Sequence, residues 1–175
     1  MTNVGGTSIH ASAVLVGNRA VLIRGPSGSG KSRLAFDLIL AGRAGQIAPA
    51  MLIGDDRVHL GASESQLIVR PAPALAGLIE IRGLGIRRCD FAHEAVVGLV
   101  ADLDARDAER MPPPEALQAE IIGIIIPRIP VGLGLTGLPL VIAALTMTAN
   151  SSSPHPSADC SKGIGNHIHS TIATE

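Results

Sequence analysis

Over the first third of the chain, short apolar runs typical of strands flank one segment whose apolar residues recur at helical spacing. Val14–Arg24 holds two β-branched and aliphatic runs around Gly17-Asn18, a dipeptide typical of tight turns, so this segment predicts a β-hairpin. Apolar residues then recur at helical spacing in Arg33–Ala41. Met51–Gly54 is a short apolar strand that ends on two acidic residues. The pattern therefore predicts a strand, a loop, a helix and another strand, in that order.

The rest of the chain predicts further strands, one more helix and a tail. Leu75–Gly85 fits either a short helix or a strand before a Gly-rich turn. Residues 106–115 read as an exposed loop, and residues 150–175 are poor in apolar side chains, which predicts a flexible tail. The other predicted elements are a hairpin over Arg57–Leu60 and Gln66–Arg70, buried strands over Ala95–Leu103 and Ile121–Ile126, and a helix over Leu138–Thr148.

Composition favours one packed domain with an aliphatic core. The 175 residues are 46% hydrophobic and 17% charged, so the chain can bury enough apolar surface to fold. The formal charge of −1 and the presence of only two aromatic residues argue against nucleic acid as a partner. Cys89 and Cys160 form no CxxC motif and follow no signal-peptide pattern, which favours a cytoplasmic protein.

One uncharged stretch raises the question of a membrane span. Ile129–Ala158 contains no Asp, Glu, Lys or Arg. Pro130, Pro139 and several glycines interrupt its first half, which leaves an apolar helix of about ten residues, too short to cross a bilayer. We therefore expect no membrane span.

The strongest chemical signal is the Gly-rich stretch between the first hairpin and the first helix. It reads Gly-x-x-x-x-Gly-Lys-Ser, the pattern of a phosphate-binding loop, in the strand–loop–helix setting that its mechanism requires. Backbone N–H groups and the helix N-terminus surround a phosphate, Lys31 bridges phosphate oxygens, and Ser32 offers a hydroxyl to Mg²⁺. The predicted nucleotide site comprises Gly25, Pro26, Ser27, Gly28, Ser29, Gly30, Lys31 and Ser32.

Charged residues beyond this loop are the next candidates. Asp55-Asp56 would by itself be a solvated turn after a strand. After a phosphate-binding loop it can divide two roles, because transfer to a hydroxyl needs one carboxylate near the metal and one to accept the proton. Glu80 and Arg82 alternate with isoleucines, so they form either one solvated strand face or part of a site.

The histidines carry less information. His10, before the first predicted strand, would by itself be read as a structural histidine. Four residues of the predicted tail are of the types that bind zinc: His155, Cys160, His167 and His169. Their spacing matches no regular zinc pattern, which argues against a metal site there.

Four segments, taken in order, resemble the catalytic domain of HPr kinase/phosphorylase. They are His10, Gly25–Ser32, Ile53–Val58 and Leu78–Ile86, and the last, Leu-Ile-Glu-Ile-Arg-Gly-Leu-Gly-Ile, is the most distinctive. The resemblance is strong over residues 8–90. It implies an α/β fold over residues 1–149: a P-loop kinase domain of the phosphoenolpyruvate-carboxykinase-like type with a mixed β-sheet. It further implies the short, catalytic-domain-only form of the family, which lacks the N-terminal domain.

The resemblance also implies a cofactor and a metal. The loop from Gly25 to Ser32 would bind ATP, with Lys31 on its phosphates. Ser32 and Glu80 would help to hold Mg²⁺, and Asp55 would support the metal or the base.

The catalytic residues that the resemblance implies complete the picture. Asp56 would accept the proton from a serine of the phosphocarrier protein HPr, as part of phosphotransferase-system regulation. His10 and Lys31 would belong to the active site. Arg110 is a weaker match to a later catalytic arginine, and the family implies a hexamer.

One segment departs from the family pattern. Long members carry a Pro-Val-x-Pro-Gly-Arg-Asn type of loop that is associated with dephosphorylation, whereas Ile129–Leu135 here contains neither Arg nor Asn. The sequence therefore predicts an ATP-dependent serine kinase and argues against phosphorylase activity.

Two other classes of function stay open. Small-molecule kinases such as nucleotide kinases share the loop pattern, but they need a basic lid and base-binding elements that this sequence does not show. The chain could also be a regulatory module that senses ATP without catalysing transfer.

Overall fold

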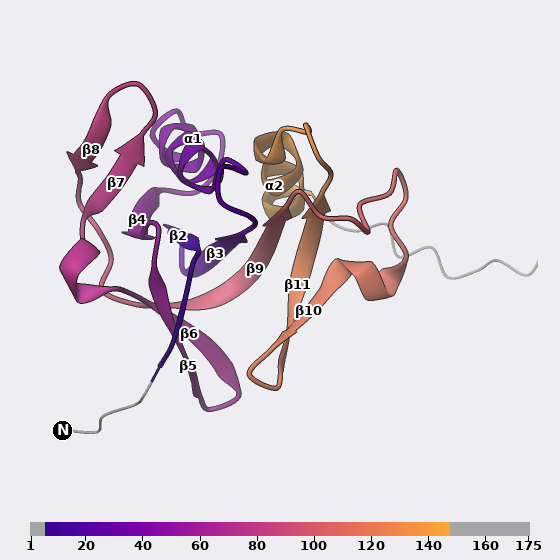
Figure 1. Cartoon of the computed structure of the whole chain (residues 1–175). Helices are drawn as coiled ribbons and strands as arrows, with labels where there is room; N and C mark the ends of the chain where they lie inside the picture. The colour runs from indigo at the N-terminus through magenta and orange to yellow at the C-terminus, as the bar shows by residue number, and fades with distance from the viewer. Residues whose placement is uncertain (1–5, 148–175) are drawn as a thin grey trace, which may run out of the picture.

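A mixed β-sheet carries both helices on one face in the computed structural model, which describes residues 6–147 (Figure 1). The helices are α1 (Lys31–Arg43) and α2 (Gly137–Thr146). A separate hairpin of β7 (Leu78–Ile81) and β8 (Gly85–Arg88) stands beside α1. The sheet contains β1 (Thr7–Ile9), β2 (Ser12–Val16), β3 (Arg19–Arg24), β4 (Ala50–Gly54), β5 (Val58–Ser63), β6 (Gln66–Pro71), β9 (Ala95–Leu103), β10 (Gln118–Ile121) and β11 (Ile124–Val131).

Strand β9 organises the edge of the sheet at which the Gly-rich loop begins. The strand order is β1-β5-β6-β9-β3-β2-β4, with β11 also paired to β9 and β10 paired to β11. β9 runs parallel to both β3 and β11, with Asp102 opposite Arg24 on one side and Pro130 on the other. The carboxyl ends of these three strands therefore meet at one edge, and the loop after β3 starts there.

Alternating residues of the central strands build a core on each face. Ile23 and Ala101 face the helices and pack in one cluster with Leu38 of α1 and Val141 of α2. Leu22 and Val100, one position away, belong to the cluster on the other face. Burying a leucine side chain fully contributes about 2 kcal/mol, so the two layers hold the loop-bearing edge in place.

Most of the expected elements are present. The hairpin at Gly17-Asn18 is formed by β2 and β3, and Gly17 has the positive φ of 61° that the first position of such a turn requires. The second predicted hairpin is β5 and β6, and the apolar strands are β4 and β9. Of the two alternatives for Leu75–Gly85, the strand is correct, because Leu78–Ile81 is β7.

The prediction of one buried strand over Ile121–Ile126 is wrong. The segment contains the turn of a hairpin, in which β10 ends at Ile121 and β11 begins at Ile124. Ile122 and Gly123 form the turn with φ of 53° and 72°. A β-branched residue rarely adopts positive φ, so the apolar run conceals the turn.

Two further expectations concern the C-terminal tail and a membrane span. The predicted tail over residues 150–175 lies outside the described residues. Among residues 6–147 we find no helix with the length and hydrophobicity of a membrane span.

Candidate active site

A cavity of about 670 Å³ lies between the Gly-rich loop, α1 and the β7–β8 hairpin. Residues from four separate segments of the chain reach it, so no single segment contains the site. Its lining consists of His10, Ser27, Gly28, Gly30, Lys31, Ser32, Arg33, Phe36, Asp37, Leu40, Asp56, Glu80, Ile81 and Arg82.

The Gly-rich loop has the open backbone that phosphate binding needs. Apart from the adjacent residues, no atom of residues 6–147 lies within 4 Å of the place where a Cβ would stand at Gly28 or Gly30, and both residues have positive φ. Helix α1 begins at Lys31, directly after the loop, so its free N–H groups point toward the cavity. Ser29 Oγ is buried and has no hydrogen-bond partner among residues 6–147. Because Ser29 does not line the cavity, the unused donors that face an anion there are the N–H groups at the start of α1.

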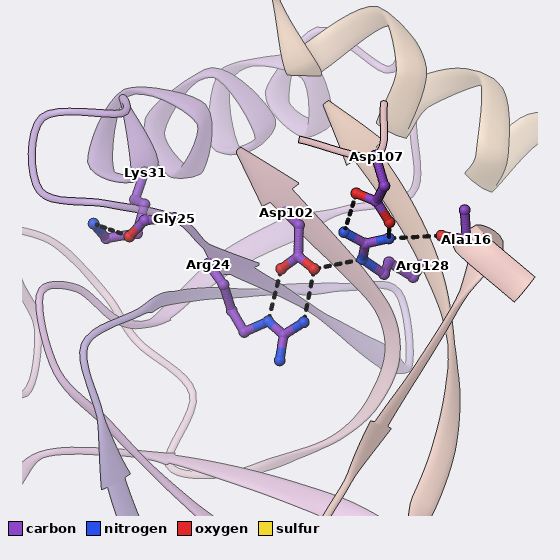
Figure 2. Close-up of polar contacts among 7 residues, drawn as sticks. All are labelled: Arg24, Gly25, Lys31, Asp102, Asp107, Ala116 and Arg128. Atoms are coloured by element: carbon purple, nitrogen blue, oxygen red, sulfur yellow. Dashed lines mark hydrogen bonds and ion pairs between the residues drawn. The ribbon is translucent and has the colours of Figure 1, made fainter. Parts of the chain in front are cut away.

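Lys31 is buried in the floor of the cavity. Lys31 is 6% exposed, and its Nζ donates a hydrogen bond to the backbone oxygen of Gly25 at 3.1 Å (Figure 2). The same Nζ also donates to the backbone oxygen of Pro26 at 2.9 Å. Burial lowers the pKa of Lys31, and the nearby carboxylates of Asp56 and Asp55 oppose that effect. An anionic phosphate would favour the charged form of the same amine.

Asp55 is a buried carboxylate with both oxygens engaged by the protein. It is 3% exposed. Its Oδ1 accepts a hydrogen bond from Ser12 Oγ at 2.5 Å, and its Oδ2 accepts one from the backbone N–H of Glu80 at 3.0 Å. Ser12 itself is 0% exposed. Asp55 therefore joins β2, the end of β4 and β7.

Asp56, the next residue, has the opposite character. Its side chain is 67% exposed and lines the cavity, and His10 Nε2 lies 3.2 Å from its Oδ1. Its φ is 64°, and the Arg57 N–H donates to the Asp55 carbonyl at 2.7 Å, so Asp56 is the central residue of a γ-turn of the rarer, positive-φ kind. Such a conformation costs on the order of 1 kcal/mol or more and is typical of functional sites.

A network of ion pairs supports the loop-bearing edge from the face opposite α1. Arg24, the last residue of β3, forms two hydrogen bonds of 2.7 Å to the Asp102 carboxylate (Figure 2). Arg128 of β11 donates to the same carboxylate, and also to Asp107 and to the carbonyl of Ala116. The network thus ties the residue before Gly25 to the loop that follows β9.

Charge keeps this network together. Burial acts to raise the pKa of Asp102, but hydrogen bonds from Arg24 and Arg128 outweigh it and hold that pKa below its usual value. A hydrogen bond from Arg128 also lowers the pKa of Asp107, and Asp107 in turn raises the pKa of Arg128. Asp102, Asp107 and Arg128 are therefore charged near neutral pH.

A family model matches all of the described residues. Residues 4–149 match the family model of the HPr Serine kinase C-terminal domain. The chain belongs to this family.

Individual relatives of the HPr kinase family resemble the chain over different lengths. An HPr kinase/phosphorylase of Enterococcus faecalis is 35% identical over 160 aligned residues, which cover 83% of this chain and 49% of that protein. One of Geobacillus kaustophilus is 34% identical, covering 71% of this chain and 40% of that protein. The chain thus spans about half, or less, of the length of these relatives.

A solved structure gives the same result for the fold. The Hpr(Ser) kinase/phosphatase from Coxiella burnetii matches with a TM-score of 0.62 and 27% identity, covering 79% of this chain and 93% of that one. The expected membership of the HPr kinase family and the expected mixed α/β sheet are confirmed.

The predicted site residues of this HPr kinase domain fall into two groups, with Arg110 outside both. Those that line the cavity are His10, Ser27, Gly28, Gly30, Lys31, Ser32, Asp56 and Glu80. Gly25, Pro26, Ser29 and Asp55 lie behind this lining, as parts of the loop or of its support. Arg110 does not line the cavity; it is exposed in the loop after β9, three residues beyond Asp107.

Several residues of the site had no signal in the sequence. Ser12 sits in an ordinary strand pattern, and Phe36 and Leu40 look like parts of an amphipathic helix, although both line the cavity. Arg24 offered the one clue, because a charged residue stands directly before Gly25 at the end of an apolar strand.

Proposed function

We propose that this domain is an ATP-dependent protein kinase, which transfers the γ-phosphoryl group of Mg-ATP to a serine of an HPr-type phosphocarrier protein. One observation carries the proposal: a phosphate-binding loop with Lys31 and an exposed carboxylate, Asp56, border the same cavity. A nucleotide-binding module without catalysis would need the loop, but it would have no use for a strained, exposed carboxylate facing that loop.

The acceptor side of the reaction would be handled by Asp56 and His10. The serine Oγ attacks the γ-phosphorus, the bond from that phosphorus to the β–γ bridging oxygen breaks, and ADP leaves. Asp56 accepts the serine proton as the new O–P bond forms. The His10 ring, 3.2 Å from Asp56 Oδ1, would hold the carboxylate in the orientation that this step needs.

The donor side would be handled by the loop. Its backbone N–H groups and the N-terminus of α1 would hold the phosphates, and the Lys31 ammonium would leave its two carbonyl partners to bind phosphate oxygens. This would stabilise the negative charge that grows on the leaving group.

The residues present fit a magnesium ion. The Ser32 hydroxyl and the Glu80 carboxylate line the same cavity as the loop, and oxygen ligands of this kind are what Mg²⁺ prefers. Within residues 6–147 no group of three or more His, Cys, Asp or Glu side chains is arranged to hold a metal. That agrees with the usual binding of Mg²⁺ by one or two protein ligands together with substrate phosphates. When bound, the ion would neutralise charge on the phosphates.

The names of relatives support the choice of acceptor, and the composition of one loop supports the direction of the reaction. The proteins from Enterococcus faecalis and Geobacillus kaustophilus are named HPr kinase/phosphorylase, which favours HPr as the acceptor here. The turn after β11 places Leu133 and Leu135 in solvent, and residues 132–135 carry no charged side chain to bind inorganic phosphate. We therefore expect the kinase direction to dominate.

The test is transfer from labelled ATP to purified HPr with Mg²⁺, with the serine phosphate located by mass spectrometry. Asp56→Asn should lower kcat by at least about 100-fold, because it removes the general base, while ATP affinity stays near that of wild type. Asp90→Asn, at an exposed acidic residue outside the cavity, is the matched control and should transfer normally.

Two results would contradict the proposal. If folded, ATP-binding wild-type protein leaves HPr unphosphorylated, HPr is not the acceptor. If Asp56→Asn transfers phosphate as fast as wild type, the exposed carboxylate is not the base.

A further inference from the structure

Asp56 and Glu80 lie on separate elements, yet both must face one cavity. Asp56 follows β4 and Glu80 belongs to the β7–β8 hairpin, which forms its own two-stranded sheet and shares no strand pairing with the main sheet. Some other contact has to fix their relative position. The structure contains one in the buried carboxylate of Asp55.

Three hydrogen bonds meet at Asp55, two of them at its carboxylate. Ser12 Oγ of β2 donates to Oδ1 at 2.5 Å, and the Glu80 N–H donates to Oδ2 at 3.0 Å. The main chain of Asp55 meanwhile closes the γ-turn, because its carbonyl accepts the Arg57 N–H at 2.7 Å. One residue thus contacts the central strands, the hairpin and the turn that presents Asp56.

The strained turn explains why such an anchor is needed. A residue with positive φ in a γ-turn keeps that conformation only when its surroundings impose it. The Asp56 side chain is mostly exposed and pairs with His10, which is itself 42% exposed, so its own contacts are weak constraints. The buried neighbour Asp55 is the rigid constraint.

We propose that Ser12 is a positioning residue for phosphoryl transfer: with Asp55 it forms a brace that holds the Asp56 turn and the Glu80 strand in register with each other. The brace rests on the proposed kinase function. It assigns Asp55 to the support of both groups rather than to the metal. The two carboxylate oxygens of Asp55 accept hydrogen bonds from Ser12 Oγ and from the Glu80 N–H, whereas the Glu80 side chain borders the cavity.

Ser12→Ala tests the brace with a small change at a site that does not line the cavity. A shift of about 1 Å in the reacting groups can cost up to about 100-fold in rate, so we expect kcat to fall by about tenfold or more. The half-saturating Mg²⁺ concentration should rise, because Glu80 loses its fixed position. ATP affinity measured without Mg²⁺ should stay near that of wild type, because the phosphate-binding loop is untouched.

Two further variants separate positioning from general destabilisation. Ser12→Thr keeps the hydroxyl and should restore both kcat and the Mg²⁺ dependence. Ser63→Ala removes an exposed hydroxyl at the end of β5 and should change neither. Asp55→Ala should have at least the effect of Ser12→Ala, because it removes the acceptors of both hydrogen bonds.

A readout independent of activity is amide hydrogen exchange. Arg57 N–H and Glu80 N–H are the two amides that the brace protects, so both should exchange faster in Ser12→Ala and at the wild-type rate in Ser63→Ala. Unchanged exchange at both amides, or unchanged kcat and Mg²⁺ dependence in folded Ser12→Ala, would overturn the brace. If wild-type protein transfers no phosphate at all, the proposed function fails, and the exchange rates alone then decide whether the brace exists.

Discussion

Gly25 and Gly28 lie in the same loop, but their surroundings differ. A Cβ at Gly25 would stand 2.6 Å from Ser29 Oγ and 3.0 Å from the backbone oxygen of Leu103, with φ at 152°. A Cβ at Gly28, with φ at 82°, would meet no described residue within 4 Å other than its two chain neighbours. The first glycine is therefore needed for packing of the loop against β9, and the second for the open face of the cavity.

Alanine at each position should separate these two roles. Gly25→Ala should lower the free energy of unfolding by about 3 kcal/mol, from overpacking and backbone strain together. Gly28→Ala should lower it by only about 1 kcal/mol, from strain alone, while weakening ATP binding because the methyl group enters the phosphate site. Urea unfolding and ATP titration of both variants measure this. Equal stability of the two proteins would contradict the prediction.

At the scale of one element, the β10–β11 hairpin carries an unfavourable turn residue. Ile122 is 49% exposed and has φ of 53°, and Gly123 follows with φ of 72°, so the turn needs positive φ at both positions. Such two-residue turns prefer Asn-Gly, because Asn adopts positive φ more readily than a β-branched residue.

Replacing the isoleucine should stabilise the protein. Ile122→Asn should raise the free energy of unfolding by about 1 kcal/mol, since it relieves backbone strain and removes an exposed apolar side chain. Ile125→Asn is the control: its side chain is 65% exposed, but it lies in β11 rather than in the turn, and strands disfavour Asn. Chemical unfolding of both variants checks the sign, and a loss of stability in Ile122→Asn would show that the turn is not strained.

Across the whole molecule, the network around Asp102 ties three strands and a loop together. Asp102 is mostly buried and contacts both Arg24 and Arg128, whereas Asp107 is half exposed and contacts Arg128 from the loop. Removing a largely buried partner leaves the remaining charges without a counter-charge, whereas removing an exposed partner costs little stability. Asp102→Asn should therefore cost about 3 kcal/mol of stability and Asp107→Asn under about 1 kcal/mol.

The same network should make stability depend on pH. The pKa values of Asp102 and Asp107 are lowered in the folded state, so the unfolded chain takes up protons first as the pH falls. Their contribution is complete above the ordinary carboxyl pKa of about 4 and is lost as the pH drops below it. Urea midpoints from about pH 6 to about pH 3 should fall less steeply for Asp102→Asn than for wild type. Parallel curves would contradict the role of Asp102.

The sequence by itself determined the elements whose causes are local. The phosphate-binding loop was predictable because glycines, lysine and serine at fixed spacing between a strand and a helix have one common physical use. The hairpin at Gly17-Asn18 was predictable because turn chemistry lies in two adjacent residues. The turn at Ile122-Gly123 was not, because isoleucine normally favours a strand and only the pairing of β10 with β11 holds it in the turn.

Only the tertiary structure decided how the site is held. Adjacent in sequence, Asp55 and Asp56 could not be told apart by pattern, yet one is buried and bonded to Ser12 while the other is exposed beside His10. Asp55 lies 43 positions from Ser12 and 25 positions from Glu80, and Arg24 and Asp102 lie 78 apart. Contacts between such distant residues arise from strand order and packing, which depend on the whole chain; one stretch of residues carries no trace of them.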